Sequence, residues 1–132
     1  MVRFKHGARL VFGVLFIGVG LLHFVRPAMF VAIVPPYLPS PEALVAVSGA
    51  AEMLLGGMLL FQSTAIAAAW GLILLLLAVY PANIHMAVNS HLFPSLSLTA
   101  LWIRLPLQFV LIGIAFWFTR SGPRSARVAA AP

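Results

Sequence analysis

The sequence predicts an all-α integral membrane protein, a bundle of four helices that cross the lipid bilayer. Apolar residues make up 63% of the 132 residues, charged residues make up only 8%, and the apolar residues fall in four long stretches. An average soluble domain has roughly 45–50% apolar and about 25% charged residues. A soluble chain of this size cannot hide so much apolar surface, because small domains bury only about 60–70% of the surface of the unfolded chain. The surplus has to face lipid.

Each of the four stretches approaches the ~20 residues that a helix needs to cross a membrane. They cover residues 8–26, 42–61, 65–88 and 99–119. Strands of a membrane barrel would be about 10 residues long and would alternate in polarity, whereas the third stretch contains the unbroken run LILLLLAVY. The first stretch follows basic residues as a signal peptide does, but no A-x-A cleavage site ends it. Residues 8–119 are therefore expected to form one four-span bundle.

The residues that connect the stretches predict a turn, a loop and the caps of two helices. Gln62, Ser63 and Thr64 form a turn short enough to force the second and third spans into an antiparallel hairpin, with Ser63 or Thr64 as the N-cap. The segment VPPYLPSPEA contains four prolines in seven positions, which predicts a stiff extended loop. Ser40 at its end is expected to cap the second span.

The distribution of Lys and Arg predicts the orientation of the bundle. Six of the eight basic residues lie near the two chain ends, and the connections 27–41 and 89–98 contain none. Because cytoplasmic segments carry the excess of Lys and Arg, both ends are expected inside the cell (N-in, C-in). Residues 1–7 are then a cytoplasmic basic segment and residues 120–132 a cytoplasmic, disordered basic tail. The expected location is the bacterial inner (cytoplasmic) membrane, as a multi-pass protein.

Composition also excludes several classes of function. The net charge of +6 would suit a nucleic-acid binder, but the basic residues form no stripe, so no nucleic-acid partner is expected. The absence of cysteine excludes disulfides, thiolate metal sites and dithiol chemistry for this polypeptide. His85 and His91 are six residues apart, and no other spacing suggests a metal site. No catalytic residue is predicted, and whether the chain is an enzyme is left open.

Polar groups within the spans are the best candidates for function, because each costs a few kcal/mol at the bilayer centre. They are His23, Arg26, Ser48, Glu52, Asn83, His85, Arg104 and Gln108. In the predicted topology every helix contributes such groups to the outer half of the membrane, and none contributes comparable groups to the inner half. Two prolines lie beside them: Pro81 frees the carbonyl of Leu77, and Pro106 frees that of Trp102.

Glu52 lies deepest, about 15 Å along its helix from Glu42 at a rise of 1.5 Å per residue. Two interpretations of this carboxyl group remain open. It pairs with Arg104 or another cation, or it stays protonated because it is desolvated; its role is then either a purely structural clasp with Arg104 or a place in a ligand-binding pocket. That pocket would be lined by one set of polar side chains from all four spans: His23, Glu52, Asn83, Arg104 and Gln108.

The order and spacing of five segments resemble the DoxX-like family of small bacterial membrane proteins. The segments are GLLHFVRPAMF, IVPPYLP, SGAAEMLLG, YPANIHMAV and LWIRLPLQ, and the resemblance covers residues 8–119. It implies a four-helix membrane bundle in which the motif positions are His23, Pro27, Pro36, Glu52, Pro81, Asn83, Arg104 and Gln108. Relatives in that family are associated with thiosulfate:quinone oxidoreductase subunits, with methylamine-utilisation maturation and with membrane redox complexes. The maturation branch is linked to dithiol chemistry, which a chain without cysteine cannot perform alone.

The resemblance and the polar residues together suggest a lipophilic-ligand-binding or redox-associated membrane subunit with a polar pocket in the outer half of the bundle. A distant similarity to the emopamil-binding and sigma-2-receptor group also implies a lipophilic ligand. Quinone is the candidate cofactor, and a membrane redox subunit or a second copy of the chain is the candidate partner besides the bilayer. The alternative is a structural or chaperone-like helper without a ligand, which would use small residues for close helix packing. These are Gly13, Gly18, Gly20, Gly49, Gly56, Gly57, Ala67, Ala68 and Gly71. An enzyme acting alone and a transporter are weaker alternatives.

Overall fold

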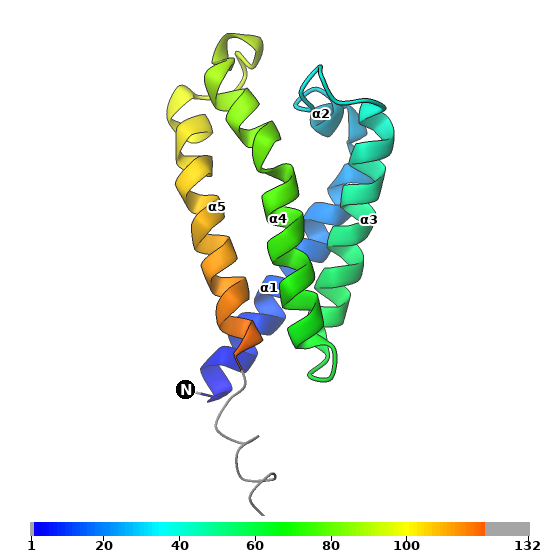
Figure 1. The fold of residues 1–132 in the computed structure, drawn as a ribbon, viewed down its shortest axis with the longest axis vertical. Helices are drawn as coiled ribbons and strands as arrows, with labels where there is room; N and C mark the ends of the chain where they lie inside the picture. The colour runs from blue at the N-terminus through cyan, green and yellow to red at the C-terminus, as the bar shows by residue number, and fades with distance from the viewer. Residues whose placement is uncertain (1, 121–132) are drawn as a thin grey trace, which may run out of the picture.

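The protein is described by a computed structural model in which residues 2–120 are placed. Four long helices follow one another: α1 (Val2–Val25), α3 (Pro41–Leu60), α4 (Ala65–Val88) and α5 (Leu98–Thr119). A short helix, α2 (Pro27–Val31), and a 3₁₀ helix, η1 (Ser90–Leu92), lie in the connections (Figure 1). All four long helices are long and apolar enough to span a membrane. The predicted all-α, four-helix membrane bundle is confirmed, and residues 2–120 contain no strand.

The bundle has two distinct ends (Figure 1). The start of α1, the end of α5 and the turn between α3 and α4 lie together, and this is named the terminal end. Helices α2 and η1 lie at the opposite end, which is named the loop end. Consequently α1 and α4 run towards the loop end, while α3 and α5 run back from it.

The helix bounds differ from the expected spans mainly in the first helix. α1 begins at Val2, so the basic segment predicted to precede the bundle is instead a continuation of this helix. Its residues include Arg and Lys, which favour helices almost as well as Leu does. The predicted disordered tail lies, apart from Arg120, outside the described residues.

The connections are more folded than the sequence suggested. The proline-rich segment forms turns rather than an extended loop, with the amide of Leu38 bonded to the carbonyl of Pro35 at 3.0 Å. Ser40 and Thr64 occupy the N-cap positions of α3 and α4, but neither side chain caps its helix. The hydroxyl of Thr64 instead donates to the carbonyl of Met58, at 2.6 Å.

Two helix pairs make up the bundle. α1 packs along α3 and α4 packs along α5, and the contact between α3 and α4 joins the pairs. The main core includes Phe12, Leu59, Leu72 and Phe118, one from each long helix. The rings of Phe12 and Phe118 meet edge to face at 5.5 Å, so α1 and α5 touch near the terminal end. A smaller cluster around Met86 and Leu101 lies near the loop end.

α1 and α3 approach each other through glycine. A Cβ atom on Gly13 would lie 2.8 Å from the carbonyl oxygen of Gly56, and one on Gly20 would lie 2.6 Å from that of Gly49. The predicted close packing is confirmed at these four positions. By contrast, a Cβ on Gly57 would meet nothing within 4 Å, and the same is true of Gly18.

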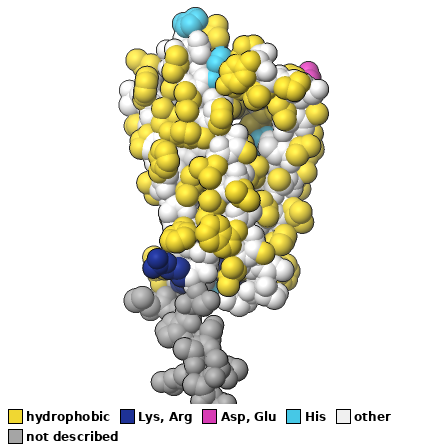
Figure 2. All heavy atoms as spheres, in the orientation of Figure 1, with side chains coloured by type: hydrophobic (Ala, Val, Ile, Leu, Met, Phe, Trp, Pro, Cys, Tyr) yellow, Lys and Arg dark blue, Asp and Glu magenta, His cyan; other side chains and the backbone are white. Residues whose placement is uncertain are grey.

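Hydrophobic side chains cover the face seen in Figure 2, and Lys or Arg side chains gather at its lower, terminal end. Large exposed residues occur on every long helix, for example Leu15 at 59%, Leu54 at 64%, Leu74 at 67% and Phe109 at 57% exposure. A surface of this kind is suited to lipid contact.

Candidate functional site

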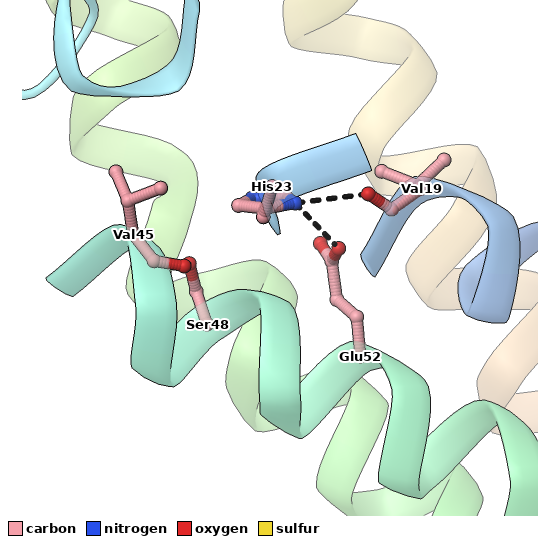
Figure 3. Close-up of polar contacts among 5 residues, drawn as sticks. All are labelled: Val19, His23, Val45, Ser48 and Glu52. Carbon is pink, nitrogen blue, oxygen red and sulfur yellow. Dashed lines mark hydrogen bonds and ion pairs between the residues drawn. The ribbon is translucent and has the colours of Figure 1, made fainter. Parts of the chain in front are cut away.

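The close approach of α1 and α3 brings two buried titratable side chains together. His23 is 7% exposed and Glu52 8%. The helices are antiparallel, and side chains lean towards the N-terminus of their own helix, so His23 leans towards the terminal end and Glu52 towards the loop end. The two side chains point at each other (Figure 3), with 3.3 Å between Nδ1 of His23 and Oε2 of Glu52.

The hydrogen bonding of this pair is incomplete. Nδ1 of His23 lies 2.9 Å from the carbonyl oxygen of Val19. A carbonyl can only accept, so Nδ1 carries the proton and donates it to Val19. Oε2 of Glu52 lies 3.3 Å from the same nitrogen, a contact that is an ion pair when the imidazole is protonated (Figure 3). No residue in the described part of the chain forms a hydrogen bond to this buried oxygen.

An aromatic ring covers the histidine. Phe30, in the short helix α2, stacks on His23 with 3.7 Å between the ring centroids and 21° between the ring planes. Ser48, one turn before Glu52, donates to the carbonyl of Val45 at 3.1 Å (Figure 3) and leaves the carboxyl group alone. Phe30 was missed by the sequence analysis, although its position just after the chain turns at Arg26 and Pro27 places it over the end of α1.

The amides of Asn83 and Gln108 form a second, separate cluster between α4 and α5. Nδ2 of Asn83 donates to Oε1 of Gln108 at 2.5 Å, and Nε2 of Gln108 donates to the carbonyl of Leu76. The carbonyl of Leu76 comes one residue before that of Leu77, which loses its helical hydrogen bond because Pro81 has no amide hydrogen. A neighbouring helix thus supplies polar contacts where a proline disturbs a membrane helix. Gln108 is only 3% exposed, and its donor and acceptor are both used.

The predicted ion pair between Glu52 and Arg104 is wrong. Arg104 is exposed on α5, and its Nη1 lies 3.8 Å from Sδ of Met86. The physical reason is the pairing of helices: Glu52 faces α1, whereas α5 packs on α4. No hydrogen bond or ion pair among residues 2–120 links Arg104 or the amide cluster to the pair on α1 and α3, so the five predicted residues do not form one polar network.

A shallow concavity of about 320 Å³ lies near the terminal end rather than in the half that holds these polar residues. It is lined by residues from α3 and the following turn: Met53, Leu54, Gly57, Met58, Phe61, Ser63 and Thr64. Its lining is mostly apolar, and neither His23 nor Glu52 contributes to it. This concavity is not the predicted polar pocket.

Sequence analysis also missed a buried polar residue near the terminal end. Arg9 is 4% exposed, its Nη1 donates to the carbonyl of Leu59, and its Nη2 lies 3.0 Å from Nδ1 of His6. Together with the hydroxyl of Thr64 on Met58, it supplies donors to the last carbonyls of α3, which have no partner inside the helix. The spacing of His6 and Arg9, three residues apart on one helix face, was the available signal.

Comparison with known proteins gives one match. Neither a curated protein nor a solved structure matches the chain. A family model matches residues 12–119, from the first turns of α1 that enter the main core to the end of α5. Its description does not mention the DoxX-like family, so the DoxX-like resemblance stays a prediction from sequence motifs. The chain belongs to the family described as Domain of unknown function (DUF8561).

Proposed function

We propose that this membrane protein binds a lipophilic molecule whose polar head donates a hydrogen bond to Glu52. The observation that carries the proposal is the buried Oε2 atom of Glu52, which accepts no hydrogen bond from the described residues. A buried polar atom without a partner costs about 1–3 kcal/mol, and more when it is charged. A hydroxyl or an amine on an apolar molecule would remove that cost.

The surroundings of Glu52 support an apolar ligand. The pair lies between membrane-spanning helices beside Val19 (Figure 3), and Phe30 stacks on His23. A ligand from the bilayer reaches such a place without crossing water. The second ring nitrogen of His23, Nε2, can serve the same polar head. Quinols, sterols and lipophilic amines all carry a suitable donor.

Among these ligands, the DoxX-like resemblance favours a quinol or quinone, and with it a redox-associated role beside a partner subunit in the bacterial inner membrane. The oxidised quinone has carbonyl groups only, which cannot donate to Glu52. The reduced quinol has hydroxyl groups, which can. The proposal therefore expects the reduced form to bind more tightly than the oxidised form.

Thermal unfolding in detergent tests the ligand. A ligand that binds the native state raises the melting temperature as its concentration rises. We expect a quinol, a sterol or a lipophilic amine to raise it for the wild-type protein and to lose most of that effect in Glu52→Gln. Glu42→Gln is the matched control, because it makes the same chemical change at an exposed position on the same helix.

Each outcome of this screen decides something. Equal shifts in wild type, Glu52→Gln and Glu42→Gln would remove Glu52 from the site. A flat response of the wild-type protein to all three ligand classes would reject ligand binding. A preference for the oxidised quinone would reject hydrogen-bond donation to Glu52.

We also propose that the terminal end faces the cytoplasm and that the loop end faces outward. The concentration of Lys and Arg at the terminal end supports this orientation, because cytoplasmic segments carry most of the positive charge. A reporter that is active only outside the cytoplasm should give a signal when it is fused near Ser40 or Leu92. The same reporter fused near Gln62 should stay silent, and a signal there would reverse the orientation.

A structural helper of another membrane protein is the second candidate. The observation that favours it is the large exposed surface of α5. Only 17% of its most apolar 18-residue segment is buried in the bundle, against 28–33% for the corresponding segments of the other three long helices. A helix with so much open surface can hold a partner helix as well as lipid. Stable co-purification with one membrane protein, together with a flat ligand screen, would favour this role.

A further inference from the structure

Arg104 is a charged residue on a membrane-spanning helix, yet its side chain is exposed rather than buried in the bundle. It lies six residues after Leu98, the first residue of α5, which is about 9 Å along the helix axis. A charged side chain at that depth is costly unless it reaches the membrane interface or meets an opposite charge.

The geometry of Arg104 shows how its charge reaches the interface. α5 runs from the loop end, and side chains lean towards the N-terminus of their helix, so the guanidinium is directed to the loop end. Its Nη1 atom lies 3.8 Å from Sδ of Met86, which is two residues from the end of α4 at Val88. The charge is thus placed near the level where the helices leave the hydrocarbon layer.

No carboxylate of the described chain meets this guanidinium. The whole sequence contains two acidic residues. Glu52 lies against His23, and Glu42, in the first turn of α3, forms no ion pair within residues 2–120. Any counter-charge for Arg104 at the interface therefore comes from outside residues 2–120.

We propose that Arg104 binds the phosphate group of an anionic phospholipid in the leaflet at the loop end. Such a phosphate lies at the level that the guanidinium reaches, and its oxygens match the planar fork of arginine, which can bond two of them at once. The acyl chains would lie on the exposed apolar surface of α5 near Trp102, which is 51% exposed. This site is independent of Glu52 and of any ligand bound there.

Trp102 provides a local reporter for the test. The other two tryptophans, Trp70 and Trp117, lie near the terminal end, five residues from the start of α4 and two from the end of α5. A parent protein with Trp70→Phe and Trp117→Phe would be placed in vesicles that contain acyl-brominated phosphatidylglycerol or acyl-brominated phosphatidylcholine. Bromine quenches tryptophan fluorescence at short range, so the quenching gives the relative association of the two lipids near Trp102.

We expect the parent to prefer phosphatidylglycerol, and Arg104→Gln to reduce this preference about threefold to tenfold, as expected for loss of one hydrogen bond of ordinary strength at an exposed position. Arg104→Lys should retain an intermediate preference, because it keeps the charge but loses the fork. Arg26→Gln is the matched control: it removes an exposed arginine at the same end of the bundle, outside the long helices.

Four results would overturn the proposal. Equal losses in Arg104→Gln and Arg26→Gln would show diffuse attraction by charge. No preference in the parent would show that no such site exists. Displacement of the lipid by millimolar inorganic phosphate would assign the site to a soluble anion. Dissociation of a dimer on Arg104→Gln, seen by light scattering, would make a second copy the source of the counter-charge.

Discussion

The two helix pairs of this bundle each bury a pair of polar side chains, and they satisfy them differently. Between α4 and α5, Asn83 donates to Gln108 and Gln108 donates to a backbone carbonyl, so Oε1 and Nε2 of the buried Gln108 are both hydrogen-bonded. Between α1 and α3, His23 donates to its own helix and leaves Oε2 of Glu52 without a hydrogen bond. Burial alone does not separate the pairs, because Gln108 at 3% is even less exposed than Glu52 at 8%.

This difference suggests a criterion for buried polar residues in such a bundle. Whether their atoms are all hydrogen-bonded, rather than how deep they lie in the membrane, distinguishes packing residues from a candidate site. A buried amide whose oxygen and nitrogen are both hydrogen-bonded, as in Gln108, holds two helices together. A carboxyl group with an unused oxygen has a reason to bind something. The pair on α4 and α5 is therefore expected to contribute to stability, and the pair on α1 and α3 is the one proposed to bind a ligand.

The largest expected effect comes from leaving Glu52 without its neighbour. In His23→Leu the carboxyl group stays buried while the imidazole 3.3 Å away is removed. Breaking a buried pair in this way typically lowers the free energy of unfolding by about 3–5 kcal/mol, whereas replacing both members by apolar residues is often near neutral. We therefore expect His23→Leu with Glu52→Leu to be more stable than His23→Leu alone in denaturant titrations in detergent.

The control for this cycle pairs Glu52→Leu with Arg104→Leu. These two changes should simply add, because Arg104 contacts Met86 and not Glu52. Strong coupling between Glu52 and Arg104, or additive effects of His23 and Glu52, would contradict the observed pairing.

A smaller effect is expected at the glycine contact that sets the distance between α1 and α3. A Cβ atom on Gly49 would lie 2.5 Å from Cβ of His23 and 3.0 Å from the carbonyl oxygen of Gly20. Gly49→Ala should therefore lower the free energy of unfolding by about 1–3 kcal/mol, the usual cost of overpacking. It should also weaken any ligand effect that depends on Glu52, because it forces apart the helices that hold the pair.

Gly57→Ala is the matched control on the same helix, because its Cβ would meet nothing within 4 Å. Alanine favours a helix over glycine by about 0.5–1 kcal/mol, so this variant should be as stable as the wild type or slightly more stable. Equal losses at Gly49 and Gly57 would show that helix propensity, not close packing, determines the effect.

Sequence predicted the four spans well because each is encoded locally, by about 20 apolar residues bounded by turn residues. α2 and η1 were not predicted, because five and three residues are too few to show a period. Four of the polar residues that the sequence singled out are buried or half-buried, namely His23, Glu52, Asn83 and Gln108, and their role in ligand binding stays a prediction. The sequence identifies these residues because polar side chains are rare in membrane-spanning helices.

Which of these polar side chains contact one another could not be predicted in the same way. Depth along each helix suggested that Glu52 and Arg104 meet, but depth does not say which helices are neighbours or which faces they present. That depends on non-local contacts, here the fit of Gly20 and Gly49 at one helix crossing. Arg9 shows the same limit: its contact with Leu59 joins residues 50 positions apart.

The smallest expected effect belongs to the amide pair. Gln108→Leu removes the acceptor of Asn83 and the donor to the Leu76 carbonyl. Hydrogen bonds between membrane helices are worth about 0.6 kcal/mol on average and up to about 1.7 kcal/mol, so a loss of about 1 kcal/mol is expected. A double-mutant cycle with Asn83→Leu should give a smaller coupling energy of about 0.6 kcal/mol, because it reports only the bond between the two side chains. The shifts in melting temperature caused by a quinol, sterol or amine should stay as in the wild type. Loss of those shifts in Gln108→Leu would instead unite the two polar pairs in one binding site, as the sequence first suggested, and would remove the contrast drawn between them.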